Sequence, residues 1–208
     1  MALAALGLLA AMPEARAEPA CSIAVLGDSL TAGLGLDLED AFPARLEEAL
    51  HARSWPCAVV DAGVSGDTSA GGAARAGWVL ADRPSHLLVE LGGNDALRAL
   101  PADQLEANLE RIMAEAAAAG VPVLLAGMLA PPNLGKTYGE AFSAAFATVA
   151  ERHEVPLYPF FLEGVAARPE LLQADGIHPN AEGVERIVEN ILPAIERWLD
   201  ATGVRPAS

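Results

Sequence analysis

The chain has 208 residues, of which 52% are hydrophobic and 20% are charged. This length and apolar content suit one α/β domain with a substantial core, and they exclude an intrinsically disordered chain. The formal net charge is −15, because 28 acidic residues outnumber 13 basic ones. A charge of this size and sign repels nucleic acids and anionic lipid headgroups, so we expect neither as a partner.

The N-terminus contains an apolar run at residues 2–12, followed by Ala15-Arg16-Ala17. The run is too short to span a bilayer, so we expect no stable membrane anchor. The small residues resemble a signal-peptide cleavage site, although no basic residue precedes the apolar run. The sequence therefore predicts a truncated signal peptide at 1–17, a single domain at 18–208 and a periplasmic or secreted protein. The alternative is a frayed N-terminal helix with no role in export.

Short apolar runs alternate with longer helical patterns along the chain, which is typical of βαβ units around a parallel sheet. The predicted strands are residues 22–27, 57–61, 86–91, 121–128 and 155–160. The predicted helices are residues 38–53, 68–82, 102–119, 139–154 and 181–201. Strands that are apolar throughout need helices on both faces of their sheet. We therefore expect a three-layer α/β/α sandwich with five parallel strands in a flavodoxin-like arrangement.

Polar stretches follow three of the predicted strands, where function gathers in such sheets. Residues 27–30 (GDSL) follow the first strand, residues 63–68 (GVSGDT) follow the second, and residues 92–95 (GGND) follow the third. A fourth polar stretch, DGIHPN at 175–180, leads into the last helix. We expect these stretches to line one crevice at the carboxyl edge of the sheet.

Ser29 lies in a tight turn after a strand and a glycine, where a hydroxyl group can act as a nucleophile if a base is within hydrogen-bond reach. A helix-capping role is the alternative for this serine. Three of the four histidines are expected in a helix or at the amino ends of strands, and these are His51, His86 and His153. His178 remains as the base, and Asp175 lies three residues before it, where its carboxylate can fix the ring tautomer.

Gly66 and Asn94 are candidates for the donors that stabilise a developing oxyanion. Gly66 has no side chain and can present its backbone N–H closely, and Asn94 can offer its carboxamide N–H. Each residue alone is equally typical of a turn or a cap. Their combination with Ser29 and His178 at the same predicted edge favours acyl transfer.

These motifs resemble, in this order, the signature blocks of the SGNH or GDSL hydrolases. The matching segments are GDSL at 27–30, the glycine of SGDTS at 65–69, the asparagine of GGND at 92–95 and DGIHPN at 175–180. LVELGGND (88–95), EAFSAAF (140–146) and VPLYPFF (155–161) are similar to the bacterial acyl-CoA thioesterase, lysophospholipase and arylesterase branch. The resemblance runs from about residue 23 to the last helix.

By position, the resemblance implies that Ser29 is the nucleophile, His178 the general base and acid, and Asp175 its orienting group. It also implies an oxyanion hole of the Ser29 N–H, the Gly66 N–H and the Asn94 side chain. In that branch the loop after the asparagine helps to shape the acyl pocket, and here this loop begins with Ala96, Leu97 and Arg98. The implied activity is hydrolysis of small acyl esters and thioesters through an acyl-enzyme, without cofactor or metal. We expect a monomer.

Two alternatives from other functional classes stay open. Residues 130–137 (APPNLGKT) end like a phosphate-binding loop, but the first glycine of that motif is missing and two prolines remove backbone donors. A non-catalytic flavodoxin-like module that binds a nucleotide or a flavin is the second alternative, because a fold alone does not fix function. A zinc-protease motif is absent, since His153-Glu154 has no second histidine four residues on.

The two cysteines, Cys21 and Cys57, have a spacing that fits no C-x-x-C motif. They open the first two predicted strands, which are neighbours about 4.8 Å apart in a flavodoxin-like order, so they can form a disulfide in an oxidising compartment. The strand register stays open, because Ser29 lies eight residues after Cys21 whereas Gly66 lies nine after Cys57. A slip of one residue would turn one of the two cysteine side chains to the opposite face.

Overall fold

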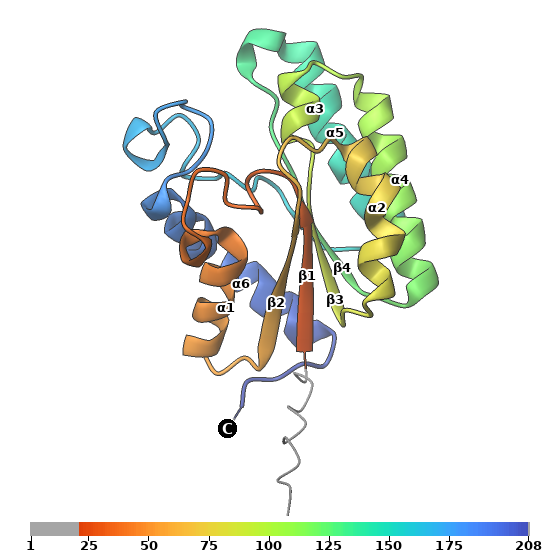
Figure 1. The fold of residues 1–208 in the computed structure, drawn as a ribbon. Coiled ribbons are helices and arrows are strands. Elements are labelled where there is room, and N and C mark those ends of the chain that lie inside the picture. The colour runs from red at the N-terminus through yellow and green to blue at the C-terminus, as the bar shows by residue number, and fades with distance from the viewer. Residues whose placement is uncertain (1–20, 208) are drawn as a thin grey trace, which may run out of the picture.

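The computed structural model describes residues 21–207 and contains one sheet of five parallel strands. The strands are β1 (Cys21–Gly27), β2 (Cys57–Gly63), β3 (His86–Glu90), β4 (Val123–Ala126) and β5 (Leu157–Tyr158). Their order in the sheet is β2-β1-β3-β4-β5, which is the flavodoxin-like order. Figure 1 shows the strands running upward to a common carboxyl edge, above which the connecting loops gather.

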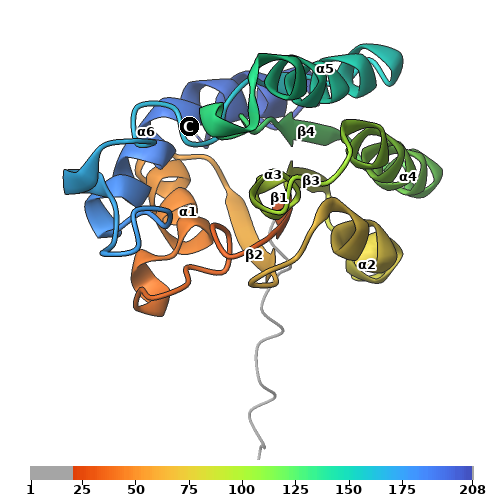
Figure 2. The same ribbon diagram turned by 90° about the horizontal axis from the view of Figure 1, so that it is seen from above.

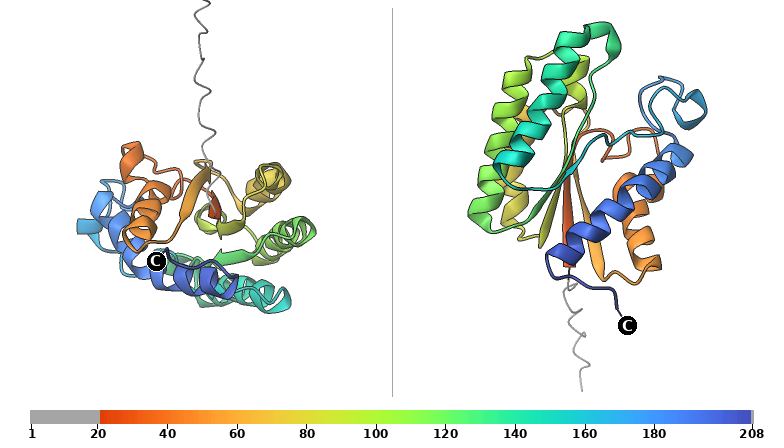
Figure 3. Two further views of the ribbon diagram at one scale, coloured as in Figure 1. Left: turned by 90° about the horizontal axis from the view of Figure 1, so that it is seen from below. Right: turned by 180° about the vertical axis from the view of Figure 1, so that it is seen from behind.

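Helices cover both faces of this sheet (Figures 1 and 3). The helices on one face are α1 (Phe42–Ala52) and α6 (Ala181–Ala201). The helices on the other face are α2 (Ser69–Ala81), α4 (Ala102–Ala119) and α5 (Lys136–Arg152). The short helix α3 (Gly93–Leu97) lies over the carboxyl edge, as the view from above in Figure 2 shows. The predicted three-layer α/β/α sandwich is therefore confirmed.

Three single turns of 3-10 helix complete the described structure: η1 (Leu38–Asp40), η2 (Pro132–Leu134) and η3 (Pro169–Leu171). The first of them corrects the predicted helix at 38–53, because the α-helix begins only at Phe42, with Pro43 in its first turn. Proline is favoured at the start of a helix because its missing N–H would be unpaired there in any case.

The last strand is much shorter than the predicted 155–160. Only Leu157 and Tyr158 pair with β4, opposite Leu125 and Ala126. Prolines occupy positions 156 and 159 on either side. Because proline has no backbone N–H to donate to a ladder, the regular ladder is confined to these two residues, although Phe161 N–H still donates to Gly127 O at 2.9 Å.

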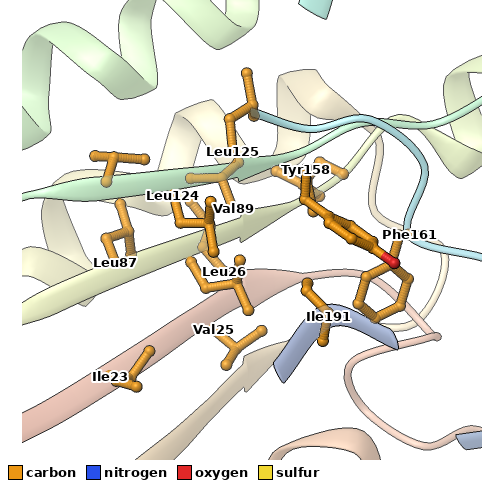
Figure 4. Close-up of a cluster of buried hydrophobic side chains, with 14 of the residues drawn as sticks. Ile23, Val25, Leu26, Leu87, Val89, Leu124, Leu125, Tyr158, Phe161 and Ile191 are labelled. Carbon is orange, nitrogen blue, oxygen red and sulfur yellow. The ribbon is translucent and has the colours of Figure 1, made fainter. Parts of the chain in front are cut away.

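The core is continuous across the sheet and its two helical layers. Figure 4 shows part of it, with side chains from β1, β3 and β4 packed together and against Phe161 and Ile191. The side chains of β1 and β3 are buried on both faces, whereas β2, at the edge of the sheet, is half-exposed. The central strands therefore hold the loops at their carboxyl ends on a rigid base.

Cys21 and Cys57 are joined by a disulfide, with their Cα atoms 4.4 Å apart. The strands pair in the register Cys21 to Cys57 and Gly27 to Gly63. The one-residue difference counted from Ser29 and Gly66 lies in the loops after the strands and not in the strands themselves. The open question of register is thus settled in favour of pairing.

The predicted signal peptide at 1–17 lies outside the described residues. Within residues 21–207, no helix has the length and apolarity that a membrane crossing requires.

Candidate active site

Ser29 lies in a tight turn directly after β1 and is largely buried. Backbone hydrogen bonds from Ala32 N–H to Asp28 O and from Leu34 N–H to Ser29 O close the turn. Gly27 permits it, because a Cβ atom at this position would lie only 1.9 Å from Thr31 Oγ1. The glycine thus lets the chain turn sharply enough to bring the Ser29 hydroxyl group to the carboxyl edge.

His178 and Asp175 form a chain of hydrogen bonds with this serine. Ser29 Oγ lies 2.9 Å from His178 Nε2, and His178 Nδ1 lies 2.6 Å from Asp175 Oδ2. The carboxylate accepts the Nδ1 proton, so Nε2 is free to accept the proton of the serine hydroxyl group. The hydrogen bond from His178, together with those from the backbone N–H groups of Ile177 and His178, lowers the pKa of Asp175 to about 2. Asp175 is therefore ionised throughout the neutral range.

The loop that carries this pair is tied to the serine turn by Gln173, a residue that the sequence did not single out. Its backbone N–H donates to His178 O at 2.8 Å, and its side-chain amide donates to Leu34 O and Pro179 O. Asn180 ends the loop by accepting from the Gly183 N–H at 2.9 Å, which caps α6. Asn180, the asparagine of DGIHPN, thus acts as the N-cap of α6. It fixes the point where the loop that carries His178 joins this helix.

The other three histidines lie away from this edge. His51 is exposed on α1, and His153 follows α5, where its Nε2 lies 2.6 Å from Glu110 Oε2. His86 opens β3 at the amino edge of the sheet. None of the three has a polar contact with Ser29 among the described residues.

Each predicted oxyanion donor has an N–H group without an acceptor among the described residues. Within residues 21–207, no acceptor takes the backbone N–H of Ser29 or Gly66. Gly66 adopts a φ of 85°, which is open to glycine. Asn94 donates one side-chain N–H to Asp28 Oδ2 at 3.0 Å, which leaves its second N–H available.

Asp28 is a buried carboxyl group that orients this asparagine. Its Oδ1 accepts the Leu30 N–H at 3.0 Å, and its Oδ2 accepts the Asn94 amide. Burial raises the pKa of Asp28 above its usual value, and the hydrogen bonds from Leu30 and Asn94 oppose that rise.

Arg75 joins the turn that carries Ser29 to the loop that carries Gly66, and sequence reasoning missed it. Its guanidinium donates to Gly27 O at 2.8 Å, to Ala62 O at 2.6 Å and to the Asp67 carboxylate at 2.7 Å. One side chain on α2 therefore links the ends of β1 and β2. Only its place nearly two helical turns into α2, after SGDTS, could have suggested this role.

An apolar pocket of about 560 Å³ opens beside the Ser29 and His178 side chains. Asn94 lines it, and so do Ala96 and Leu97 of the predicted substrate-binding loop. Its other walls come from the segment after β4 at 128–132 and from the segment at 160–172. Sequence reasoning did not anticipate these two walls.

Gly66 and Arg98 are placed differently from the remaining predicted site residues. Neither lines the pocket; instead Arg98 Nη2 donates to Gly66 O at 2.9 Å. The predicted substrate-binding loop is thus divided, with two side chains facing the pocket and the third holding the backbone of the Gly66 loop.

The segment that resembles a phosphate-binding loop does not form a phosphate site. Pro131 and Pro132 line the apolar pocket, and Lys136 is exposed with its Nζ 3.6 Å from Glu140 Oε1. Across the described part of the chain, no group of three or more His, Cys, Asp or Glu side chains is placed to hold a metal ion. The nucleotide-binding alternative is not favoured by this arrangement.

Known proteins are similar to this chain in both sequence and fold. The family model for the GDSL-like lipase/acylhydrolase family matches residues 25–186. The chain is 42% identical over 194 residues to Esterase TesA of Pseudomonas aeruginosa, which covers 93% of this chain and 96% of that protein. It is 42% identical over 168 residues to the thioesterase 1/protease 1/lysophospholipase L1 of Escherichia coli K12, with 80% and 79% covered. The crystal structure of the psychrotrophic esterase EstA from Pseudoalteromonas sp. matches with a TM-score of 0.82 at 32% identity, over 86% of this chain and 98% of that one.

The resemblance drawn from the four motifs is therefore confirmed. The family match spans the segments that carry Ser29, Asn94 and His178, and the solved relative repeats the fold that brings them together. The chain belongs to the GDSL-like lipase/acylhydrolase family.

Proposed function

We propose that this protein is a serine hydrolase that cleaves acyl esters and thioesters through an acyl-enzyme intermediate. The observation that carries the proposal is the hydrogen-bonded chain Ser29–His178–Asp175, with distances of 2.9 Å and 2.6 Å, at the side of an apolar pocket. A serine hydroxyl group is a weak nucleophile until a neighbouring base removes its proton, and this geometry supplies the base and its orienting carboxylate.

In the acylation step, Ser29 Oγ attacks the acyl carbonyl carbon while His178 Nε2 takes the hydroxyl proton. Asp175 stabilises the imidazolium that forms. Negative charge develops on the carbonyl oxygen, where the N–H groups of Ser29, Gly66 and Asn94 stabilise it. His178 then gives its proton to the departing alkoxide or thiolate.

Deacylation repeats these steps with water as the nucleophile. His178 removes a proton from the water, the hydroxide attacks the acyl-serine ester, and the tetrahedral intermediate collapses to release the carboxylic acid. The proton returns to Ser29 Oγ, so no cofactor or metal is consumed or required by the chemistry.

The substrate class follows from the pocket. Its lining is predominantly apolar and includes Ala96 and Leu97, so it suits the hydrocarbon chain of an acyl group. The names of the relatives, an esterase and a thioesterase/lysophospholipase, support ester and thioester substrates. The Pseudoalteromonas esterase is described as inhibited by monoethylphosphonate, a behaviour expected of a serine nucleophile.

We also propose that the protein works in the periplasm or outside the cell, as a single domain from residue 18 onward. The Cys21–Cys57 disulfide supports an oxidising compartment. The apolar run at 2–12 and the small residues after it support export. The monomeric state remains a prediction.

A fluorophosphonate probe tests the central proposal directly. We expect it to label the protein once, on the peptide that contains Ser29, and we expect Ser29→Ala to abolish the label. Labelling that persists in Ser29→Ala would refute the assignment. Rates on p-nitrophenyl esters and acyl-CoA thioesters of increasing chain length then define the acyl preference, and binding of ATP or FMN without hydrolysis of any ester would favour the non-catalytic alternative.

A further inference from the structure

Glu90, the last residue of β3, is a fully buried carboxyl group that the proposed mechanism does not use. It lies directly below the nucleophile turn, opposite Gly27 of β1 in the strand register. Its Oε2 accepts the Thr31 hydroxyl at 2.7 Å and lies 3.5 Å from the Asp28 backbone nitrogen. Its Oε1 is buried without a hydrogen-bond partner among the described residues. A charged carboxylate is poorly accommodated in such a place.

Among the described residues, no positively charged side chain compensates a negative charge on Glu90. Within residues 21–207, no Lys, Arg or His side chain makes a polar contact with it. The charged group that acts on it is Asp28, another buried acid. Burial raises the pKa of Glu90 well above its usual value, and the neighbouring Asp28 carboxylate raises it further. Two neighbouring buried carboxyl groups do not both ionise easily, so we expect one of them to hold a proton.

Hydrogen bonding decides which member of the pair keeps the charge. Asp28 accepts an N–H on each oxygen, from Leu30 and from Asn94, both at 3.0 Å. Glu90 accepts the Thr31 hydroxyl at 2.7 Å and only weaker contacts from the backbone N–H groups of Asp28 and Thr31, and among the described residues its Oε1 has no hydrogen-bond partner. Because N–H donors stabilise the ionised form, the charge belongs on Asp28 and the proton on Glu90.

We propose that Glu90 is a positioning residue: a protonated carboxyl group that supports the nucleophile turn through Thr31 and leaves the charge of the pair on Asp28, which orients Asn94. The functional half of this proposal rests on the proposed roles of Ser29 and Asn94. The close packing at Gly27 supports it, since a Cβ there would lie 2.7 Å from Glu90 Oε2. The turn is therefore in direct contact with the carboxyl group that supports it.

Infrared spectroscopy tests the protonation state without any reference to activity. We expect the wild-type protein at neutral pH to show the carbonyl stretch of a protonated carboxyl group. That band should be absent from Glu90→Gln and retained in Asp28→Asn. A wild-type spectrum without the band, or a band that only Asp28→Asn removes, would overturn the proposal. If Glu90→Gln does not fold, Thr31→Val should shift the band, because it removes the hydroxyl that donates to Glu90.

Kinetics test the positioning role. Glu90→Met keeps the volume of the side chain and removes the acceptor, so we expect kcat to fall about tenfold, the value of one hydrogen bond, with KM unchanged. Glu90→Gln keeps a neutral acceptor and should restore most of this loss. An equal loss in Glu90→Gln would show that a charge is needed at this position and would refute the proposal.

The Thr31 end of the same hydrogen bond provides a matched check. Thr31→Val should lower kcat in the same direction as Glu90→Met, Thr31→Ser should not, and the double variant Glu90→Met/Thr31→Val should cost no more than the worse single variant. Additive losses would mean that the two residues act separately. The failure of the proposed function looks different: Ser29→Ala would then keep its activity, while the infrared band of Glu90 would be unaffected.

Discussion

The two ends of the sheet each hold a serine in contact with a histidine, and only one of these pairs is equipped for catalysis. At the carboxyl end, Ser29 Oγ lies 2.9 Å from His178 Nε2. At the amino end, Ser85 Oγ lies 2.8 Å from His86 Nδ1. The second ring nitrogen makes the difference, because His178 meets the Asp175 carboxylate whereas the partner of His86 is the hydroxyl group of Thr202.

The two Ser–His pairs also differ in their surroundings, and not only in the group that contacts the second ring nitrogen. His86 is buried edge-on against Trp198, with ring centroids 4.9 Å apart, and the Cys21–Cys57 disulfide lies beside it. Ser85 Oγ already donates its proton to Ser22 O, so it has none to give to a base. The carboxyl end instead has an open apolar pocket and, as far as residues 21–207 show, N–H groups without acceptors. A Ser–His contact is thus not a catalytic site until a carboxylate, oxyanion donors and space for substrate accompany it.

Replacing Ser29 or Ser85 by alanine should give the largest difference in kcat between the two ends of the sheet. We expect Ser29→Ala to lower kcat by about 10⁴-fold or more, since Ser29 is the proposed nucleophile and its loss removes the covalent route. Ser85→Ala should keep kcat and lose only about 1 kcal/mol of unfolding free energy, the value of the hydrogen bonds to Ser22 and His86. Ester hydrolysis and urea unfolding of both variants measure this, and a comparable fall of kcat in Ser85→Ala would break the distinction.

The disulfide should affect stability alone. Its sequence separation is 36 residues, for which the chain-entropy model gives about 4 kcal/mol of stabilisation. We expect Cys21→Ala/Cys57→Ala to lose up to this free energy of unfolding and to retain its kcat below the unfolding transition. Reductant should destabilise the wild type and leave the double variant unchanged. Two free thiols in denatured, unreduced protein prepared from the periplasm would show that the bridge does not form.

Asn94 tests the chemistry of the carboxyl end without touching the hydrogen-bonded chain. Loss of one oxyanion donor lowers kcat by about 10²–10³ in comparable sites, and we expect Asn94→Ala to do so with little change in KM. Steady-state rates on one ester at several concentrations separate the two constants. A raised KM with normal kcat would make Asn94 a residue for substrate binding and would remove it from the oxyanion hole.

The sequence predicts the layers and the edge of the sheet where the site lies, because strand periodicity and strand-end polar residues are local signals. It also places Ser29, His178 and Asn94 at that edge. It does not reveal Arg75 or Gln173, whose hydrogen bonds run to backbone carbonyls that only the folded chain brings close. Such contacts carry no sequence spacing of their own.

Two further features escaped sequence reasoning for similar reasons. Helix α3 (Gly93–Leu97) is too short to show a helical period, so the sequence predicts no helix between the third strand and residue 102. The turn of Arg98 towards Gly66 depends on where that helix ends, so the division of the predicted substrate loop could not be foreseen.

The smallest predicted effect is the contribution of His86 to the pH dependence of stability. It again distinguishes His86 from His178. Burial lowers the pKa of His86, so the folded protein resists its protonation, whereas the unfolded chain takes up that proton near pH 6.5. The unfolded state therefore binds more protons below about pH 6.5, and the contribution of His86 to the free energy of unfolding decreases as the pH falls, by at most about 1.4 kcal/mol per pH unit.

Two acidic residues at the carboxyl end of the sheet must also be considered when the pH dependence of stability is measured. Asp175, with a pKa of about 2, is ionised in both states above pH 5 and contributes no slope there. Glu90 has a raised pKa, so its contribution has the opposite sign and decreases as the pH rises. The test is therefore the difference between the wild type and His86→Gln. We expect the stability advantage of the wild type to shrink from pH 7.5 to 5.5 in urea titrations, while kcat stays equal in both. A constant difference across this range would mean that His86 titrates alike in the folded and unfolded chain.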